Sequence, residues 1–428
     1  MSGVDTADLV LEVERIGVRG DGIALYQGRH VYLPLTAPGD RVRVRLGARR
    51  EEGWSGEVIE LIEAGARQTP PCLHFGTCGG CALQHLSDAA YGGAKEALVR
   101  EALVHRGLDP SVVGPLRRLP MATRRRTRLA LERARSGLQR LGFHARASHE
   151  VVDLQGCAVL HPSLLRLVDP LRLLAQDMFR PKDKGAATMT LSEPGVDLVL
   201  DLPREPDYPA LERLATFTEA QELARLSWRP DERIAPIPVA QRRVPAVSFS
   251  GVLVELPPAS FLQASVEADR LLAALVLEGV GHAPRVADLY SGLGTLTFAM
   301  SGRGASVLAV DAAAASIGAL KIAAARAGLG TRVSSVVRDL DRRPLGAEEL
   351  GSFDAVVFDP PRAGARAQVQ ALARCEVPVV VAVSCNPATF ARDARILLDG
   401  GYRLIRVEPI DQFLWSPHVE LVAHFRRP

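Results

Sequence analysis

Short runs of alternating apolar and polar residues fill the first part of the chain, from about residue 9 to residue 61. In the clearest run, Arg41, Arg43 and Arg45 alternate with valines, and glycines and prolines separate the runs as turn formers. Alternation with a period of two places the arginines on one face of a strand and the valines on the other. The pattern predicts a small β-barrel with a basic wall, of the kind that can bind single-stranded nucleic acid. The alternative is a strand face whose arginines are only solvated.

The last part of the chain, from about residue 241, has a different pattern, in which β-branched apolar runs alternate with longer helical stretches. The strand candidates are residues 286–290, 307–310, 333–337, 355–358 and 379–383, with helices expected up to Met300 and Ala327. Strands that alternate with helices indicate a parallel, doubly wound α/β sheet.

Between these parts lies a mixed α+β segment that begins near Pro70-Pro71. It holds a predicted helix over Ala94–Arg106 and a basic stretch that includes Arg124, Arg125 and Arg126. These patterns divide the chain into three expected domains, at residues 1–66, 67–240 and 241–428. The basic stretch and the arginine strand of the barrel are candidate contacts to nucleic-acid phosphates.

Composition narrows the class of protein. The chain has 428 residues, of which 47% are hydrophobic and 24% charged, and this balance excludes a largely disordered, collagenous or coiled-coil protein. There is no apolar stretch long enough to span a membrane and no basic, apolar leader, so a cytoplasmic location is expected. The net charge of +3 is too small to indicate nucleic-acid binding by itself.

A glycine turn follows the first strand of the predicted sheet, in the segment DLYSGLGT at residues 288–295. Glycines between a strand and a helix let the backbone approach a bound nucleotide closely. A dinucleotide fingerprint has a third glycine where this chain has Thr297, whereas Asp311 ends the next strand and can accept hydrogen bonds from ribose hydroxyls. The combination favours S-adenosylmethionine over NAD.

Polar residues also follow two later strands. Asp359 is held by two adjacent prolines after residues 355–358, and Cys385 lies in Ser-Cys-Asn-Pro after residues 379–383. Ligands bind beyond the carboxyl ends of such strands, so a Cys385 thiolate there can act as a nucleophile. Glu420 begins an apolar run, and a desolvated carboxylate can serve as a base near neutral pH. The alternative for Cys385 is a buried structural thiol, and the alternative for Glu420 is a solvated surface charge.

Four cysteines in the first half of the chain form a separate group: Cys72, Cys78, Cys81 and the more distant Cys157. Three cysteines this close, with glycines between them, indicate a metal site. Zinc is one alternative, with His74 or Cys157 as the fourth ligand, and a four-thiolate iron–sulfur cluster is equally consistent with the ligand chemistry.

Together the motifs resemble those of the uracil-C5 RNA methyltransferases, in particular the iron–sulfur-containing branch that acts on 23S ribosomal RNA. The resemblance covers residues 9–425 and implies a TRAM domain, a central iron–sulfur domain and a C-terminal Rossmann-like class I methyltransferase domain. It implies Cys385 as nucleophile, Glu420 as base and a [4Fe–4S] cluster held by Cys72, Cys78, Cys81 and Cys157. The residues that it assigns to the S-adenosylmethionine pocket are Gln263, Tyr290, Thr295, Asp311, Asp339 and Asp359.

The implied reaction forms 5-methyluridine: the thiolate adds to uracil C6, C5 accepts the methyl group, and the base removes the C5 proton. RNA is therefore the expected partner, and a monomer is the default expectation. Alternatives are a transfer RNA uracil-C5 methyltransferase and a non-catalytic RNA-binding protein of the same fold. A DNA cytosine methyltransferase is disfavoured because its nucleophile follows proline, and an NAD-dependent oxidoreductase because the third glycine is missing.

Overall fold

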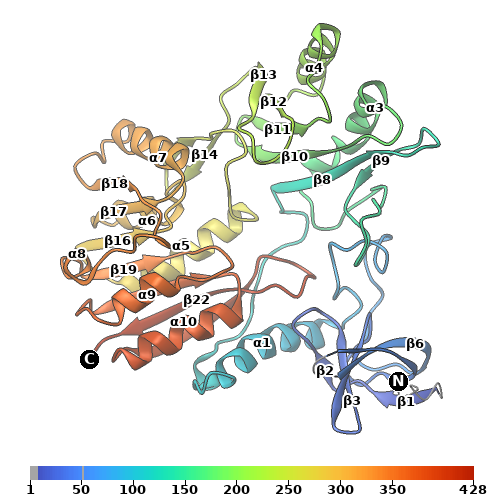
Figure 1. Ribbon diagram of the computed structural model, residues 1–428. Helices are drawn as coiled ribbons and strands as arrows, with labels where there is room; N and C mark the ends of the chain where they lie inside the picture. The colour runs from blue at the N-terminus through green and yellow to red at the C-terminus, as the bar shows by residue number, and fades with distance from the viewer. Residues whose placement is uncertain (1–7, 51–52) are drawn as a thin grey trace.

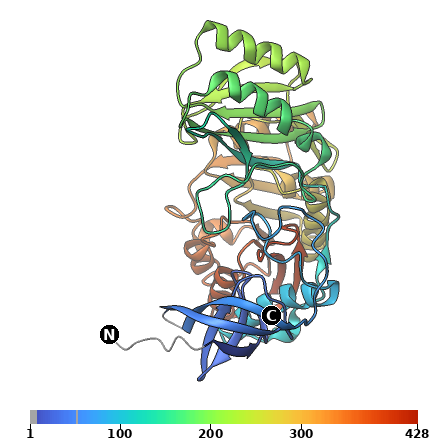
Figure 2. The same ribbon diagram turned by 90° about the vertical axis from the view of Figure 1, so that its right-hand side faces the viewer.

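The computed structural model describes residues 8–50 and 53–428, which form three β-sheet-based parts (Figure 1). Figure 2 shows the parts stacked, with the central sheet at one end, the C-terminal sheet in the middle and the N-terminal strands at the other end. Within the described ranges, no helix is long and apolar enough to cross a membrane.

The N-terminal part is a six-stranded sheet with the order β1-β5-β6-β4-β3-β2. Its strands are β1 (Leu9–Glu12), β2 (Arg15–Ile16), β3 (Gly22–Tyr26), β4 (Arg29–Leu33), β5 (Arg41–Arg50) and β6 (Gly53–Glu63). Val42 and Val44 are fully buried and pack with Leu11, Val31 and Leu33. The predicted alternation is therefore confirmed, and this end of the chain is β-rich as expected.

The arginines on the outer face of β5 do not form a free basic wall. Each lies within ion-pair distance of a carboxylate on a neighbouring segment. The pairs are Arg41–Glu63 at 3.2 Å, Arg43–Glu60 at 3.0 Å and Arg45–Asp8 at 3.3 Å. Such exposed pairs add little to stability, but they cancel the local positive charge. Phosphate contacts by this strand stay a prediction, because its arginines are exposed but already paired with acids.

The central part is a six-stranded sheet with the order β13-β12-β11-β10-β8-β9. The strands are β8 (Arg126–Arg133), β9 (Gln139–Gly142), β10 (Lys184–Ser192), β11 (Gly195–Asp201), β12 (Arg225–Arg229) and β13 (Ile237–Gln241). Helices α2 (Pro162–Leu165), α3 (Val168–Met178) and α4 (Tyr208–Ala220) supply Leu164, Leu171 and Leu214 to its core. A hairpin of β14 (Ala246–Phe249) and β15 (Val252–Glu255) follows the sheet.

The C-terminal part contains an eight-stranded sheet with the order β18-β17-β16-β19-β20-β22-β21-β7. Its parallel strands are β16 (Arg285–Leu289), β17 (Ser306–Asp311), β18 (Val333–Val337), β19 (Ala355–Phe358) and β20 (Val379–Ser384). Two further strands complete it, β21 (Arg403–Asp411) and β22 (Glu420–Arg426), with β22 antiparallel to both neighbours. The chain order reverses between β16 and β19, and ligands bind at such a switch point, beyond the carboxyl ends of the strands.

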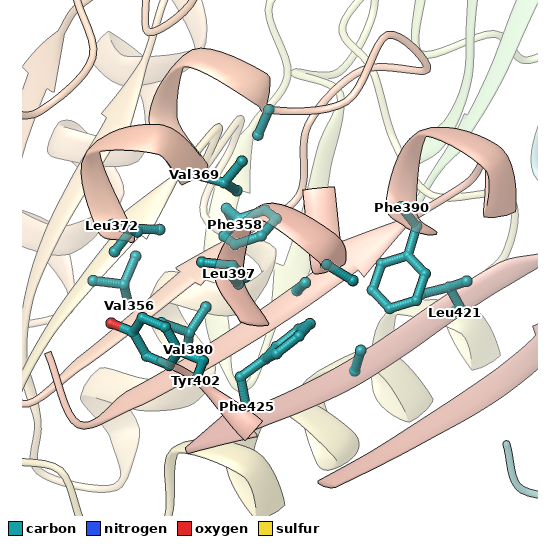
Figure 3. Close-up of a cluster of buried hydrophobic side chains, with 14 of the residues drawn as sticks. Val356, Phe358, Val369, Leu372, Val380, Phe390, Leu397, Tyr402, Leu421 and Phe425 are labelled. Carbon is teal, nitrogen blue, oxygen red and sulfur yellow. The ribbon is translucent and has the colours of Figure 1, made fainter. Parts of the chain in front are cut away.

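Helices cover this sheet and hold the strand ends in place. They are α5 (Val266–Val280), α6 (Thr295–Gly302), α7 (Ala314–Arg326), α8 (Ala347–Leu350), α9 (Arg366–Leu372) and α10 (Pro387–Asp399). Figure 3 shows Phe358 of β19, Phe390 of α10 and Phe425 of β22 in one buried cluster. Burial of each such side chain stabilises the fold by about 1.5–3 kcal/mol. This packing fixes the strands that end at the site.

One segment crosses the predicted domain boundaries. Helix α1 (Asp88–Val104) packs its Leu98 and Val99 into the C-terminal core, and the short 3-10 helix Pro110–Val112 and strand β7 (Arg117–Arg118) follow it. β7 pairs with β21 at the edge of the C-terminal sheet. The helix also starts earlier than the predicted Ala94, because the Ser87 hydroxyl accepts the Ala90 N–H and caps it. The first half of the chain thus contributes directly to the C-terminal part.

Candidate active site and cysteine cluster

The loop after β16 has the strained backbone that a close ligand approach requires. Tyr290, Gly292 and Gly294 have φ angles of 60°, 54° and 94°, in the left-handed region. A side chain at Gly294 would start 2.7 Å from the Phe298 ring, so a residue with a Cβ does not fit there. Asp311, at the end of β17, accepts the Gly292 N–H at 2.9 Å. The acid and the glycine turn are therefore fixed to each other at the carboxyl ends of β16 and β17.

Asp288 is a buried acid of this motif to which the sequence alone assigns no role. Its side chain is fully buried, and the Thr297 hydroxyl donates a hydrogen bond to its Oδ2 atom. Burial raises the pKa of Asp288 to about 7. Among the described residues, its Oδ1 atom and the Ser291 hydroxyl have no hydrogen-bond partner. Unpaired buried polar atoms are costly, so these two atoms are candidates for hydrogen bonds to a polar ligand.

The other predicted cofactor residues lie at the same edge of the sheet. The Tyr290 hydroxyl donates a hydrogen bond to Asp341 at 3.2 Å. Asp341 is not among the predicted site residues. Asp339, two residues beyond β18, accepts the backbone N–H groups of Asp341 and Arg342 and so stabilises the turn. Thr295 is the first residue of α6. These polar groups and the glycine turn fit a nucleoside-containing cofactor such as S-adenosylmethionine.

Cys385 and Glu420 are brought together by the antiparallel pairing of β20 and β22. Cys385 directly follows β20, Glu420 begins β22, and Ser384 pairs with Leu421 in the register between them. Cys385 is half-buried and lines a cleft of about 700 Å³, whereas Glu420 is 2% exposed. The antiparallel strand explains how residues 35 positions apart meet, because its start lies at the carboxyl ends of the parallel strands.

Two glutamines connect the buried acids of the site. The Gln263 amide donates to Asp359 Oδ2 at 2.9 Å, and the Gln412 amide donates to Gln263 Oε1 at 3.0 Å. The Gln412 Nε2 atom also donates to Glu420 Oε2. Sequence motifs identify Gln263 and Asp359 as site residues, whereas Gln412 is a lone glutamine after a strand and gives no signal.

Burial shapes the protonation of these groups. It raises the pKa of Asp359 to about 7, and it raises that of Glu420 well above the usual glutamate range, with the Asp359 charge adding to the rise. Burial, Glu420 and Asp359 together raise the pKa of Cys385 to about 11, while the positive charge of Arg362 opposes the rise. The site therefore holds a thiol and a carboxyl group whose charged forms are disfavoured by burial, and the positive charge of Arg362 favours the thiolate form of Cys385.

The four cysteines of the first half line one cavity of about 140 Å³. All four are free and half-buried, and the Gly80 N–H donates to Cys78 Sγ at 3.4 Å. Burial raises the pKa of Cys81 to about 12, and the charges of the other three cysteines each add to the rise. Across residues 8–50 and 53–428, however, no group of three or more His, Cys, Asp or Glu side chains is arranged to hold a metal ion.

Four thiols around one cavity are a donor set for two kinds of group. A tetrahedral zinc ion binds each sulfur at ~2.3 Å and so holds the sulfurs ~3.8 Å apart. An iron–sulfur cluster is a larger group that four thiolates hold between them. His74 Nε2 accepts the Gln155 N–H at 3.0 Å, so this nitrogen is already hydrogen-bonded. The donor set fits either group.

The predicted basic stretch has mainly structural contacts. Arg125 is buried, forms an ion pair with Asp269 at 2.5 Å and donates to the Gln263 carbonyl oxygen at 3.2 Å. Arg124 donates to the Arg126 carbonyl oxygen at 3.0 Å and lines the cysteine cavity. The prediction that these arginines bind phosphates is wrong for Arg125, because its guanidinium joins the central sheet to α5.

The cysteine segment contacts the loop that leads to Glu420. The backbone N–H groups of Ala82 and Leu83 both donate to the Trp415 carbonyl oxygen, at 2.8 and 3.0 Å. Cys81 lines both the 140 Å³ cavity and the 700 Å³ cleft that contains Cys385. The cysteine cluster is thus a wall of the candidate active site rather than a remote element.

Comparison with known proteins identifies the family. The model of the tRNA (uracil-5-)-methyltransferase family matches residues 257–427. A Chromohalobacter salexigens 23S rRNA (uracil(1939)-C(5))-methyltransferase is 34% identical over 421 residues, which cover 96% of this chain and 87% of that protein. The chain belongs to the uracil-C5 RNA methyltransferase family. This methyltransferase is also 41% identical to a Brucella suis protein named an uncharacterized RNA methyltransferase, over 414 residues that cover 96% of each.

A solved structure extends the likeness of this methyltransferase to the fold. The Pyrococcus abyssi tRNA (uracil-54, C5)-methyltransferase, in complex with S-adenosyl-L-homocysteine, matches with a TM-score of 0.73 and 22% identity. The match covers 98% of this chain and all of that one. It confirms the predicted Rossmann-like methyltransferase fold, and the family confirms an RNA uracil-C5 methyltransferase.

Proposed function

We propose that this chain forms 5-methyluridine in 23S ribosomal RNA, with Cys385 as nucleophile, Glu420 as base and S-adenosylmethionine as methyl donor. The observation that carries the proposal is the meeting of Cys385 and Glu420 at adjacent strand ends, one facing a cleft and the other buried. The 23S ribosomal RNA target is supported by the name of the Chromohalobacter relative, which is similar over 96% of this chain.

The electronic structure of uracil explains why a thiolate is needed. C5 is too weak a nucleophile to take a methyl group directly. When the Cys385 sulfur forms a bond to C6, the C5–C6 electron pair moves into an enolate and makes C5 nucleophilic. Sulfur suits this step because it is a good nucleophile and also a workable leaving group. Arg362 supports it, because its charge favours the thiolate of Cys385.

Glu420 completes the reaction. After C5 has bonded to the methyl carbon, the Glu420 carboxylate takes the C5 proton. The electrons of the C5–H bond restore the C5–C6 double bond and expel the Cys385 sulfur. The high pKa of Glu420 makes it an effective base, and its buried place excludes water from the reacting carbon. The methyl–sulfur bond of the donor breaks in the transfer and leaves S-adenosylhomocysteine, so the products are 5-methyluridine, S-adenosylhomocysteine, a free thiolate and a proton that passes from Glu420 to solvent.

The methyl donor is assigned to the glycine turn after β16. We assign Asp311 to the ribose hydroxyls, in addition to the Gly292 and Ala313 N–H groups that it accepts, and we assign Tyr290, Thr295 and Asp339 to the same cofactor. Gln263 donates to Asp359, and the Asp359 charge acts on Cys385, so this acid is close to the nucleophile. When bound, S-adenosylmethionine supplies an electrophilic methyl group and a positive sulfonium charge.

The RNA reaches the site through the 700 Å³ cleft, which exposed cations line. Arg19, Arg106 and Arg362 are all exposed there, in contrast to the paired arginines of β5. A uridine must leave its stack to reach Cys385, and phosphate contacts at the cleft rim hold the flipped nucleotide. Arg19 lies in the turn between β2 and β3, which supports the assignment of the N-terminal part as a TRAM-like domain that binds RNA.

The cysteine group is assigned to a [4Fe–4S] cluster bound by Cys72, Cys78, Cys81 and Cys157. Methyl transfer needs no electron, so the cluster has a structural role. It would fix the segment whose Ala82 and Leu83 hold the Trp415 carbonyl oxygen, and thereby the loop before Glu420.

Replacing any one of these four cysteines with serine is expected to remove the cluster, because a serine hydroxyl is a poor ligand for iron in this setting. We expect anaerobically purified protein to contain about four irons and four sulfides per chain, and each variant to lose most of both. Iron and sulfide assays measure the loss. The matched control is Cys375→Ser, a buried cysteine outside the cavity, which is expected to keep the cluster. One zinc and no iron per chain would contradict the assignment.

The function itself is tested by incubating the protein with labelled S-adenosylmethionine and, separately, with unmodified ribosomal RNA, transfer RNA and single-stranded DNA. The expected result is label in 5-methyluridine of 23S ribosomal RNA, as identified by nucleoside analysis. Label in 5-methyluridine of transfer RNA alone would keep the mechanism and overturn the substrate. Cofactor binding without transfer to any of the three would favour a non-catalytic RNA-binding protein.

A further inference from the structure

Gln412 directly follows β21 and is 7% exposed. Its Nε2 atom uses one hydrogen for Glu420 Oε2 and the other for Gln263 Oε1, and its Oε1 atom accepts the Ala264 N–H at 3.3 Å. Both polar atoms of the Gln412 side chain therefore make hydrogen bonds within the protein. The Glu420 Oε1 atom has no hydrogen-bond partner among the described residues, so Gln412 is the one side-chain donor seen on that carboxylate.

This arrangement fixes the direction of a second amide. Because Gln263 Oε1 accepts from Gln412, the Gln263 Nε2 atom must face Asp359, to which it donates at 2.9 Å. N–H groups thus point toward both buried acids, and hydrogen bonds to a charged acceptor favour its ionised form. Without Gln412, the Gln263 amide is free to turn over and present its oxygen to Asp359.

The backbone around Gln412 is held by α1. Lys95, which is fully buried, donates to Asp411 at 2.5 Å and to the carbonyl oxygens of Phe413 and His418 at 3.0 and 2.8 Å. Tyr91 donates to the other oxygen of Asp411 at 2.6 Å. These contacts tie both ends of the loop that separates Gln412 from Glu420. The position of Gln412 is therefore determined by more than its own hydrogen bonds.

We propose that Gln412 is a positioning residue that holds the Glu420 carboxylate in its ionised form for removal of the C5 proton and that orients Gln263 toward Asp359. This inference rests on the proposed function. It assigns to Gln412 the late step of the reaction, the release of the methylated base from Cys385, rather than the first addition.

Other charged groups around Glu420 set the background for this role. They are Cys385 after β20, Asp359 and Arg362 after β19, His418 on the preceding loop, the Lys95–Asp411 pair of α1 and β21, and the Arg125–Asp269 pair beside the Gln263 backbone. The Asp359 charge disfavours ionisation of Glu420, whereas the Gln412 hydrogen bond favours it. If Gln412 is replaced, the Asp359 charge still disfavours ionisation of Glu420, but the hydrogen bond that favours it is lost.

The test replaces Gln412 with methionine, which has similar length and no donor. In single-turnover reactions with 23S ribosomal RNA, we expect the covalent Cys385–RNA adduct to resolve about tenfold more slowly at pH 7. The rate is expected to recover at higher pH, with the midpoint of the pH profile raised by about one pH unit. The sign follows from the loss of a donor to the ionised form, which raises the pKa of Glu420.

Gln368→Met is the matched control, because Gln368 is also fully buried, holds Leu345 with two hydrogen bonds and lies in α9, away from the site. It should lower the melting temperature without moving the pH profile. Gln412→Glu, which keeps the side-chain shape, tests the role if the methionine variant does not fold, and it should shift the midpoint in the same direction. A wild-type profile in a folded Gln412 variant would overturn the inference. Absence of any adduct or 5-methyluridine in the wild-type protein would instead overturn the proposed function.

Discussion

Replacing Cys385 with alanine is expected to reduce methyl transfer to RNA by at least about a thousandfold, since a nucleophile that forms a covalent intermediate has no substitute in the site. Glu420 cannot make C5 nucleophilic by itself, because it acts only after the methyl group has arrived. S-adenosylmethionine binding should be retained, because the glycine turn and Asp311 lie at other strand ends. Transfer of labelled methyl groups measures the first effect, and calorimetry of cofactor binding measures the second.

Cys375→Ala provides the control for this variant. Cys375 is buried in the core of the same part of the chain and lines neither the cleft nor the cysteine cavity. The Cys375→Ala variant should be less stable than the wild type, because the substitution leaves a small cavity. It should still transfer methyl groups to RNA. A Cys385→Ala protein with activity close to that of the wild type would exclude the thiolate mechanism.

The strand ends were the part of the site that the sequence could predict. Strand runs at 286–290, 355–358 and 379–383 place Tyr290, Asp359 and Cys385 at one edge of a parallel sheet, and the structure has strands at almost the same residues. The prediction succeeds because fully buried parallel strands consist of continuous runs of β-branched residues, which are visible in the sequence. Ligands bind at the carboxyl ends of such strands.

The contacts between distant parts of the chain could not be predicted in this way. The Lys95–Asp411 pair joins residues 316 positions apart, and Arg125–Asp269 joins residues 144 apart. A single sequence shows both as isolated charges. The same limit explains the arginines of β5, whose acidic partners become visible only when the strands pair in register. Gln412 has no motif at all, and only its position between Gln263 and Glu420 gives it a role.

Replacing Glu420 with glutamine is expected to block the reaction at a different point and leave RNA covalently attached to Cys385. The amide keeps the size of the carboxylate but cannot take the C5 proton, so the double bond is not restored and the sulfur is not expelled. Turnover should fall by about 10²–10⁴-fold, the usual contribution of a general base. Labelled 23S ribosomal RNA should therefore migrate with the protein on a denaturing gel, and the attached base should already carry the methyl group.

The double variant Cys385→Ala/Glu420→Gln tests whether the covalent bond to RNA is made by Cys385. It lacks the sulfur that forms the bond and should give no adduct, although the cleft and the cofactor pocket are unchanged in it. An adduct in the double variant would assign the covalent bond to another residue, and rapid turnover by Glu420→Gln alone would remove Glu420 from the role of base. Because Cys385 acts before methyl transfer and Glu420 after it, the two variants should differ in which species accumulates: unmodified RNA in one, and methylated, protein-bound RNA in the other.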